Sequence, residues 1–375
     1  MDLSYGTNVH PAQDLPGVLA QLDRYAEPVR RHLGADRLGL GLWLAADVAH
    51  GLAADPDAVR RLRAELDARG LQVSTLNAFP YRGFHDTVVK QAVYHPRWTD
   101  PARLRFTADC ARVLAALLPD EADYGSISTL PLGWRQPWSD ADSATSTVAL
   151  AALVRELRAL GRPIRLAVEP EPGCVLDTVE DAVRWLADRV DPRYVGLCLD
   201  TCHLAVSFAD PRCALEQITA AGLAVVKVQA SAALHVADPS SAPARRALAE
   251  FTEPRYLHQV RELRPDGTVL AADDLPATEL PAHGPWRVHY HVPLHWTPKP
   301  DEPVRPTTDV LRAVLEVVDC EHVEVETYTW NVLPATQRPG TDTELVAGIA
   351  AELTSARRLL DATRLEPART IERWS

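Results

Sequence analysis

Short apolar runs recur along the chain and alternate with longer stretches in which apolar residues return every three or four positions. Runs of the first kind are typical of buried β-strands, and stretches of the second kind are typical of amphipathic helices. The predicted strands span residues 3–9, 38–44, 71–79, 122–129, 163–170, 194–200, 223–230 and 321–328. Eight strands that alternate with helices predict a (β/α)8 TIM barrel, a fold of the α/β class.

The predicted helices have clear boundaries. The segment 55–70 begins with Asp-Pro and ends in Gly70, which are typical start and stop residues of a helix. The segments 146–161 and 177–190 show the same apolar period, and each leads into the next predicted strand. This regular alternation favours a closed barrel over an open sheet.

A large insertion is predicted after the seventh strand. A minimal barrel of this type needs roughly 250 residues, and the longest excess in this 375-residue chain lies at 231–306. Within it, residues 256–275 predict a hairpin that turns at Pro-Asp-Gly, and 286–296 predict a ninth, returning strand. Loops that follow barrel strands lie on the face that carries active sites. We therefore expect one domain over 1–375, with the insertion over that face.

Composition and charge exclude several classes of function. The net charge is −12, so a broad basic surface for nucleic acid is not expected. No run of about 18 apolar residues predicts a membrane span, and the first residues lack the pattern of a signal peptide. The six cysteines show no spacing typical of a disulfide framework. These features predict a cytoplasmic protein with a small-molecule partner.

Polar residues stand at the ends of the last four barrel strands. Because side chains alternate along a strand, Glu169, Asp200, Gln229 and Glu326 share the parity that points into the barrel. Several buried carboxylates that converge on one place need a cation or protons to be stable. A divalent metal is the simplest explanation. The alternative for Asp200 is a structural role, in which it and Thr201 cap the next helix while His203 is an interior histidine.

Three motifs together resemble a known family. They are "VEPEPG" on the fifth strand, "LDTCH" on the sixth and "VEVETYTW" on the eighth. With them the chain resembles the xylose isomerase-like TIM barrels of the sugar phosphate isomerase/epimerase superfamily, which include sugar isomerases, ketose 3-epimerases, inosose dehydratases and endonuclease IV. The stretches "KVQASAAL", "HYHVPLHW" and "VETYTWNVLP" look more narrowly like the EboE-type metabolite traffic proteins.

The resemblance implies a metal site with one departure from the family pattern. In the epimerase-like members a glutamate, an aspartate, a histidine and a glutamate on strands five to eight bind one divalent ion. These positions correspond to Glu169, Asp200, Gln229 and Glu326, so an amide stands where the histidine is expected. An amide is a weaker ligand than imidazole for a transition metal. His291, on the predicted returning strand, is the candidate for the missing nitrogen, and the ion is Mn, Zn, Co or Fe.

The reaction that the resemblance implies is proton transfer next to a carbonyl. A metal on the substrate oxygens makes the adjacent C–H more acidic, and two carboxylates can remove a proton and return one. Glu169 and Glu326 are the predicted pair. Glu171 is an alternative to Glu169 as ligand or base.

Further residues are predicted to contact a polyhydroxylated substrate. His203, Glu171 and His289 lie close to the metal site in sequence, and Lys90 and Trp134 stand on site loops. Lys90 could meet a carboxylate or phosphate, while the indole of Trp134 suits the C–H side of a sugar or cyclitol. The remaining candidates are Asn8 and Asn77, near the ends of strands one and three.

Other functions stay open at this stage. A non-catalytic metabolite-binding or traffic protein on the same barrel is favoured by the missing strand-seven histidine. A cyclitol dehydratase is a variant of the leading hypothesis. Hydrolysis in the manner of endonuclease IV is disfavoured by the acidic composition. Barrels of this family often pair, so a homodimer is the oligomer that the resemblance implies.

Overall fold

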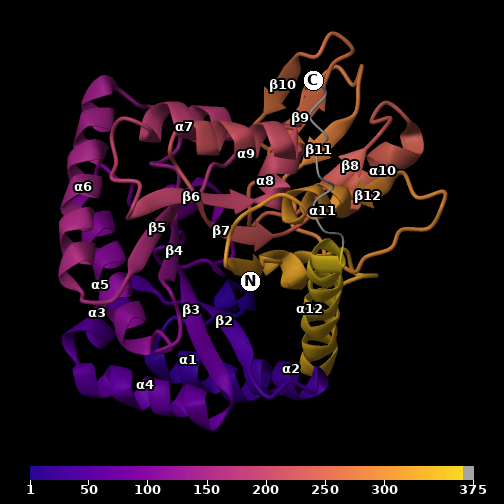
Figure 1. Cartoon of the computed structure of the whole chain (residues 1–375). Helices are drawn as coiled ribbons and strands as arrows, with labels where there is room; N and C mark the ends of the chain where they lie inside the picture. Colours follow the sequence, from indigo (N-terminus) through magenta and orange to yellow (C-terminus); the bar gives the residue numbers. More distant parts are fainter. Residues whose placement is uncertain (366–375) are drawn as a thin grey trace, which may run out of the picture.

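The computed structural model describes residues 1–365 and places eight parallel strands in a closed barrel (Figure 1). In chain order they are β1 (Asp2–Gly6), β2 (Leu38–Trp43), β3 (Leu71–Asn77), β4 (Gly125–Thr129), β5 (Ile164–Val168), β6 (Val195–Asp200), β7 (Val225–Ala230) and β13 (His322–Val325). Each overlaps one predicted strand, and β1 closes the barrel between β2 and β13. The predicted TIM barrel is confirmed. The last residues of the predicted domain, 366–375, lie outside the described part.

Helices surround the barrel, and their starts follow the capping signals in the sequence. They are α1 (Leu15–Gln21), α2 (Glu27–His32), α3 (Ala46–Ala54), α4 (Pro56–Ala68), α5 (Pro101–Leu117), α6 (Asp140–Ala159), α7 (Val179–Leu186), α8 (Thr201–Val206), α9 (Pro211–Ala220), α11 (Thr308–Leu315) and α12 (Asp342–Leu365). The carboxylate of Asp55 accepts two backbone N–H groups at the start of α4, and Gly70 has a φ of +66° just past its end. No helix within residues 1–365 is long and apolar enough to cross a membrane.

A second, antiparallel sheet forms beside the barrel from the segment after β7 (Figure 1). Its strands are β8 (Leu234–Val236), β9 (Val260–Leu263), β10 (Val269–Ala272), β11 (Trp286–Val288) and β12 (Val304–Pro306), and it is accompanied by α10 (Ala242–Glu250). The predicted hairpin is confirmed, with Leu263 opposite Val269. The treatment of 231–306 as an insertion in one domain stays a prediction.

The predicted ninth strand is too long. It was expected over 286–296, but β11 ends at Val288. Beyond that point the backbone bonds to loops that follow barrel strands: the N–H of Val292 donates to Ala232, and the carbonyl of His291 accepts from Thr329. Pro293 also lacks the N–H that a strand would use. His289 and His291 therefore lie in an irregular segment that reaches over the barrel.

The barrel interior holds a charged pair directly below the strand ends. Lys227 of β7 lies 3.1 Å from the carboxylate of Glu324 on β13, and both side chains are fully buried. The same ammonium donates to Ser128 of β4 at 3.2 Å. Room for the Glu324 carboxylate comes from Gly41 of β2, where an added Cβ would lie 1.1 Å from Oε2.

Gly41→Ala is therefore expected to lower the free energy of unfolding by about 3 kcal/mol, because the new methyl group would push Glu324 away from Lys227. Urea unfolding followed by circular dichroism measures the change. The matched control is Gly51→Ala in α3, where an added Cβ meets nothing within 4 Å and alanine favours the helix. Equal unfolding midpoints for the two variants would contradict the close fit at Gly41.

Candidate metal centre

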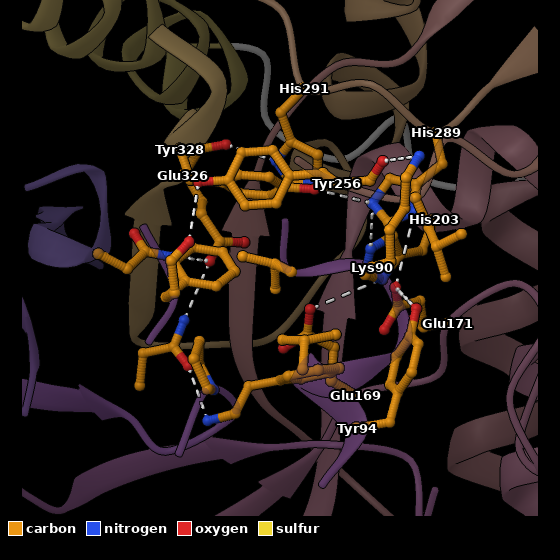
Figure 2. Close-up of a pocket in the computed structure, with 18 residues that line it drawn as sticks. Lys90, Tyr94, Glu169, Glu171, His203, Tyr256, His289, His291, Glu326 and Tyr328 are labelled. Carbon is orange, nitrogen blue, oxygen red and sulfur yellow. Dashed lines mark hydrogen bonds and ion pairs between the residues drawn. The ribbon is translucent and has the colours of Figure 1, made fainter. Parts of the chain in front are cut away.

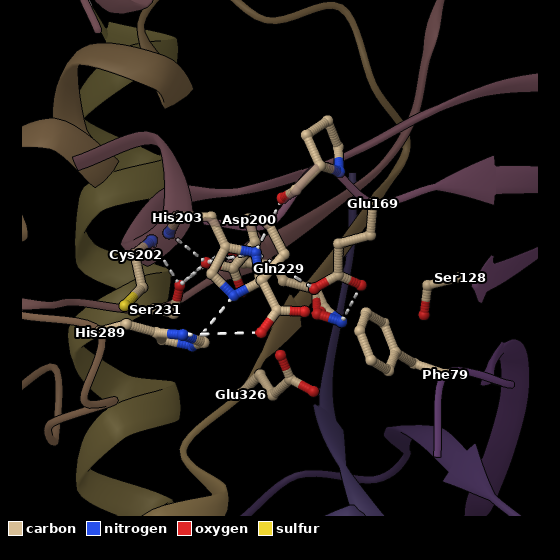
Figure 3. Close-up of polar contacts among 12 residues, drawn as sticks. Phe79, Ser128, Glu169, Asp200, Cys202, His203, Gln229, Ser231, His289 and Glu326 are labelled. Carbon is tan, nitrogen blue, oxygen red and sulfur yellow. Dashed lines mark hydrogen bonds and ion pairs between the residues drawn. The ribbon is translucent and has the colours of Figure 1, made fainter. Parts of the chain in front are cut away.

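Three carboxylates converge at the carboxyl ends of three barrel strands (Figure 3). Glu169 follows β5, Asp200 ends β6 and Glu326 follows β13, and all three are buried. One oxygen from each lies within 4.8 Å of the others. The sequence argument from strand parity predicted this convergence.

The electrostatics of the three carboxylates differ. Burial, and then the charges of neighbouring carboxylates, raise the pKa of Glu169 and of Glu326 well above the ordinary value. Burial also acts to raise the pKa of Asp200. The charges of His203 and His291, together with hydrogen bonds from His203 and Ser231, outweigh burial, so the pKa of Asp200 is lowered. Without a cation, the two glutamates would have to hold protons.

Asp200 serves two purposes with its two oxygens. Oδ1 accepts from the backbone N–H of His203 at 2.9 Å and from the hydroxyl of Ser231 at 2.8 Å, so it caps α8. Oδ2 is buried and has no hydrogen-bond partner among the described residues. The capping role and a ligand role are therefore compatible, because they use different atoms.

His291 turns a lone pair toward this free oxygen. Its Nδ1 lies 2.7 Å from the carbonyl oxygen of Glu326, which can only accept, so Nδ1 carries the proton. Nε2 is then an acceptor that is buried without a partner in the described part of the chain, 3.9 Å from Oδ2 of Asp200. Two facing acceptors beside two further carboxylates fit a divalent cation. Residues that would hold it are Glu169, Asp200, Glu326 and His291.

Three amide side chains orient the carboxylates. Gln229 donates from Nε2 to Glu169 at 3.1 Å, and its own Oε1 is buried without a partner in the described region. Asn8 and Asn77 both donate to Oε1 of Glu326, at 2.7 and 3.0 Å. In the structure all three amides contact the carboxylates. Metal ligation by Gln229 stays a prediction, as do substrate contacts by Asn8 and Asn77.

A second group lies next to the first and lines the same cavity (Figure 2). Glu171, His203 and His289 are buried, and one ligand atom from each lies within 4.8 Å of the others. Burial raises the pKa of Glu171 to about 8. Tyr94 donates its hydroxyl to Oε1 of Glu171 at 2.7 Å. The structure thus brings three of the seven predicted substrate-binding residues, Glu171, His203 and His289, to one place.

The cavity itself is small and has an apolar wall opposite the carboxylates. Its volume is about 50 Å³. The apolar and aromatic lining residues are Phe79, Pro80, Phe84, Val89, Val93, Tyr94, Tyr256, Leu257 and Tyr328. One side of a bound molecule would therefore meet acidic and imidazole groups, and the other would meet aromatic rings.

Two predicted substrate contacts are placed differently. Lys90 lines the cavity, but its ammonium pairs with Asp274 at 2.6 Å and donates to the carbonyl of Tyr256. Trp134 is not among the cavity's lining residues and packs against Tyr94, with ring centroids 5.2 Å apart. Substrate contacts by Lys90 and Trp134 stay predictions.

Several contributors to the site carried little sequence signal. Gln259, at the start of the predicted hairpin, donates to Tyr94 and accepts from His289. Ser231 and Tyr328 flank the predicted positions, and their proximity to Gln229 and Glu326 in the sequence was the only available signal. Tyr256 lies on the cavity wall far from any motif, so sequence patterns could not identify it.

Comparisons with known proteins agree with this architecture. A family profile described as "Xylose isomerase-like TIM barrel" matches residues 31–254, more than half of the chain. A search of curated proteins finds no match. Among solved structures, a xylose isomerase-like TIM barrel protein from Mycobacterium smegmatis in complex with magnesium has a TM-score of 0.52 at 14% identity, over 96% of this chain and 97% of that one. D-psicose 3-epimerase with D-tagatose from Clostridium cellulolyticum H10 has a TM-score of 0.50 at 14% identity, over 96% and 99%. At these identities the likeness shows the fold.

Proposed function

Since this chain belongs to the xylose isomerase-like TIM barrel family, we propose that it is a metal-dependent isomerase or epimerase of a small sugar-like or cyclitol-like metabolite. One observation carries the proposal. Glu169, Asp200 and Glu326 converge in a buried site. Beside them the lone pair of His291 and one oxygen of Asp200 lack any partner in the described chain.

The cation would be held by Glu169, Asp200, Glu326 and His291, with Gln229 within reach of the same place. When bound, it would polarise a substrate carbonyl and stabilise the charge that develops on proton removal. This ligand set is rich in oxygen and contains one imidazole, which suits Mn, Co, Fe or Zn.

Glu169 and Glu326 are the proposed proton-transfer pair. They project from β5 and β13, which β6 and β7 separate in the barrel, so they approach a bound molecule from different sides. Asn8 and Asn77 hold one oxygen of Glu326, and Gln229 holds one of Glu169, which leaves each carboxylate an oxygen for the substrate. Removal by one carboxylate and return by the other inverts a carbon or moves a carbonyl.

The substrate class follows from the two unlike sides of the cavity. Hydroxyl and carbonyl groups suit the acidic side, while the C–H face of a ring suits the aromatic wall of Phe84, Tyr256 and Tyr328. A specific EboE-type role, a cytoplasmic location and a homodimer stay predictions.

The proposal is tested by elemental analysis and isotope exchange. We expect metal at the carboxylate centre of protein purified without chelators, and deuterium incorporation from D2O into one member of a panel of ketoses and inososes, followed by proton NMR. Alkene signals would identify dehydration of a cyclitol. Tight binding of a panel member without exchange would favour a metabolite-binding or traffic protein, in which Gln229 replaces the histidine that catalysis needs.

The cavity is narrow in this conformation, about 50 Å³, and we propose that it widens to admit a sugar ring. Two segments of the cavity wall, 89–94 and 256–257, form what we call its mouth, and Lys90 joins them. Its ammonium binds Asp274, and the N–H groups of Val89 and Lys90 both donate to the carbonyl of Arg255 at 2.8 Å. The backbone of Lys90 has a φ of +41°, a strained conformation for a non-glycine residue.

Lys90→Met is therefore expected to speed amide hydrogen exchange in residues 86–95 by about tenfold, because the part-buried ion pair that holds the closed state is lost. Mass spectrometry of deuterated peptides measures this. The control is Lys299→Met at an exposed lysine, which should leave those peptides unchanged. Equal exchange in both variants would show that Lys90 does not hold the mouth closed.

A further inference from the structure

The protons on His203 and His289 can be located from their hydrogen bonds (Figure 3). Nδ1 of His203 lies 3.0 Å from the carbonyl oxygen of Pro170, which can only accept. Nδ1 of His289 lies 2.7 Å from Oε1 of Gln259. The orientation of that amide is set by its nitrogen, which donates to the carbonyl of Pro172 at 2.9 Å. Both rings therefore carry their proton on Nδ1.

The two Nε2 atoms are then left as facing lone pairs. They lie 3.1 Å apart, and no hydrogen is available from either neutral ring to fill the gap. Both rings are buried, so water does not screen this repulsion well. A hydroxyl at 3.4 Å, that of Tyr328, reaches only His289. Two lone pairs at this distance need a positive group that both can bind.

Glu171 places a carboxylate beside the two rings: its Oε1 lies 3.6 Å from Nδ1 of His289, and one ligand atom from each of the three residues lies within 4.8 Å of the others. Its Oε1 accepts from Tyr94, while its Oε2 is buried and has no partner in the described part of the chain. The side chain is 5% exposed. A carboxylate oxygen and two imidazole nitrogens thus form a cluster of acceptors, in which the Tyr328 hydroxyl reaches one of the nitrogens.

We propose that Glu171, His203 and His289 form a second cation site, next to the carboxylate centre, which takes a transition metal of the zinc class. Two imidazoles and one carboxylate with an open fourth position are a donor set typical of catalytic zinc. The carboxylate centre has mainly oxygen ligands, so the two sites differ in the metal that they favour. This inference does not depend on an isomerase activity.

The alternative to a metal is a proton shared between the Nε2 atoms of His203 and His289. It is disfavoured because a proton between the two nitrogens would leave Oε2 of Glu171 without a partner in the described chain, whereas a cation can bind that oxygen and both nitrogens. The ring protons already have carbonyl acceptors, which is also the arrangement that orients metal-binding histidines. The geometry thus favours a metal over a proton, and the two are separable by experiment.

The test is zinc stoichiometry on the full-length, metal-stripped protein, measured by calorimetric titration and by elemental analysis after dialysis. We expect two equivalents in the wild type and one in Glu171→Gln and in His289→Gln. The matched control is Glu262→Gln, another fully buried carboxylate that accepts three hydrogen bonds in the inserted sheet, and it should keep both equivalents.

One equivalent in the wild type that Glu171→Gln leaves unchanged would overturn the second site and favour the shared proton. Loss of metal in Glu262→Gln as well would reduce the result to a folding effect and overturn the assignment. The carboxylate centre is tested apart, by Glu326→Gln and Asp200→Asn. If those two lose no metal while Glu171→Gln loses one equivalent, the proposed function fails and the second site stands.

Proton NMR of the Co²⁺-loaded protein shows directly which histidines bind metal, and a merely structural role of Glu171 would not change these signals. Each of His203, His289 and His291 has an Nδ1–H held by a carbonyl oxygen, so each proton should exchange slowly. In the fully Co²⁺-loaded wild type we expect three exchangeable, paramagnetically shifted proton signals. Glu171→Gln should keep only the signal of His291. Three signals in that variant would contradict the proposed ligand set.

Discussion

Glu326→Gln is expected to lower the rate of deuterium exchange into the substrate by about 1,000-fold or more while the fold is kept. The amide can neither accept nor return the proton, and acid–base groups typically contribute 10²–10⁴-fold. The buried site tolerates a neutral group there, because burial already raises the pKa of this carboxyl well above its ordinary value. NMR exchange rates and circular dichroism measure the two effects.

The control for this variant is Glu321→Gln, at an exposed glutamate just before the same strand and on the opposite end of the barrel. It should exchange at the wild-type rate. Retained turnover in Glu326→Gln would remove Glu326 from the acid–base pair. Asp200→Asn separates metal binding from proton transfer, because it should lose the metal of the carboxylate centre although Asp200 is not one of the proposed pair.

Lys227→Met is expected to lower the free energy of unfolding by about 3–5 kcal/mol, the range for a buried ion pair that loses one partner. Glu324 would then be a fully buried carboxylate without its cation, close to Gly6 and Gly41. Burial lowers the pKa of Lys227, but the charge of Glu324 and of further acidic groups outweighs burial, so the pKa of Lys227 is raised and the ammonium keeps its proton in the native barrel. Urea unfolding midpoints measure the loss.

Two further variants show whether the stability lost in Lys227→Met comes from the unpaired charge of Glu324. Lys227→Met combined with Glu324→Gln should recover much of the stability, because no net charge then remains buried. Arg212→Met removes one partner of an exposed pair, Arg212 and Glu316 at 3.7 Å, and should change the midpoint little. An unchanged midpoint in Lys227→Met would mean that water reaches Glu324 in the barrel interior.

The strand pattern predicted more of the site than any single motif. Because strand parity is periodic and all strands of this barrel are parallel, the inward positions of Glu169, Asp200 and Glu326 followed from the sequence. The sequence also indicated the helix cap at Asp200. A cap and a metal ligand are alternatives at the level of sequence, but in the structure Oδ1 caps the helix and Oδ2 has no partner in the described chain.

The irregular segment after β11 was the main source of error. His289 and His291 were placed on a strand by their alternation, but β11 ends at Val288, and the two imidazoles reach the site because loops after β7 and β13 hold the backbone. The substrate contact of Lys90 stays a prediction, and its ammonium pairs with Asp274, a residue 184 positions away. Patterns of one segment carry no information on such distant partners.

The sequence by itself determined the barrel, the order of its strands and the carboxylates at their ends, because periodic burial and parallel pairing depend on local alternation. Only the tertiary structure decided which imidazole nitrogens carry lone pairs, which oxygens lack partners and how far the cavity is closed. These properties depend on hydrogen bonds between residues far apart in the chain. Their geometry is set by the packing of irregular loops, for which no periodic rule exists.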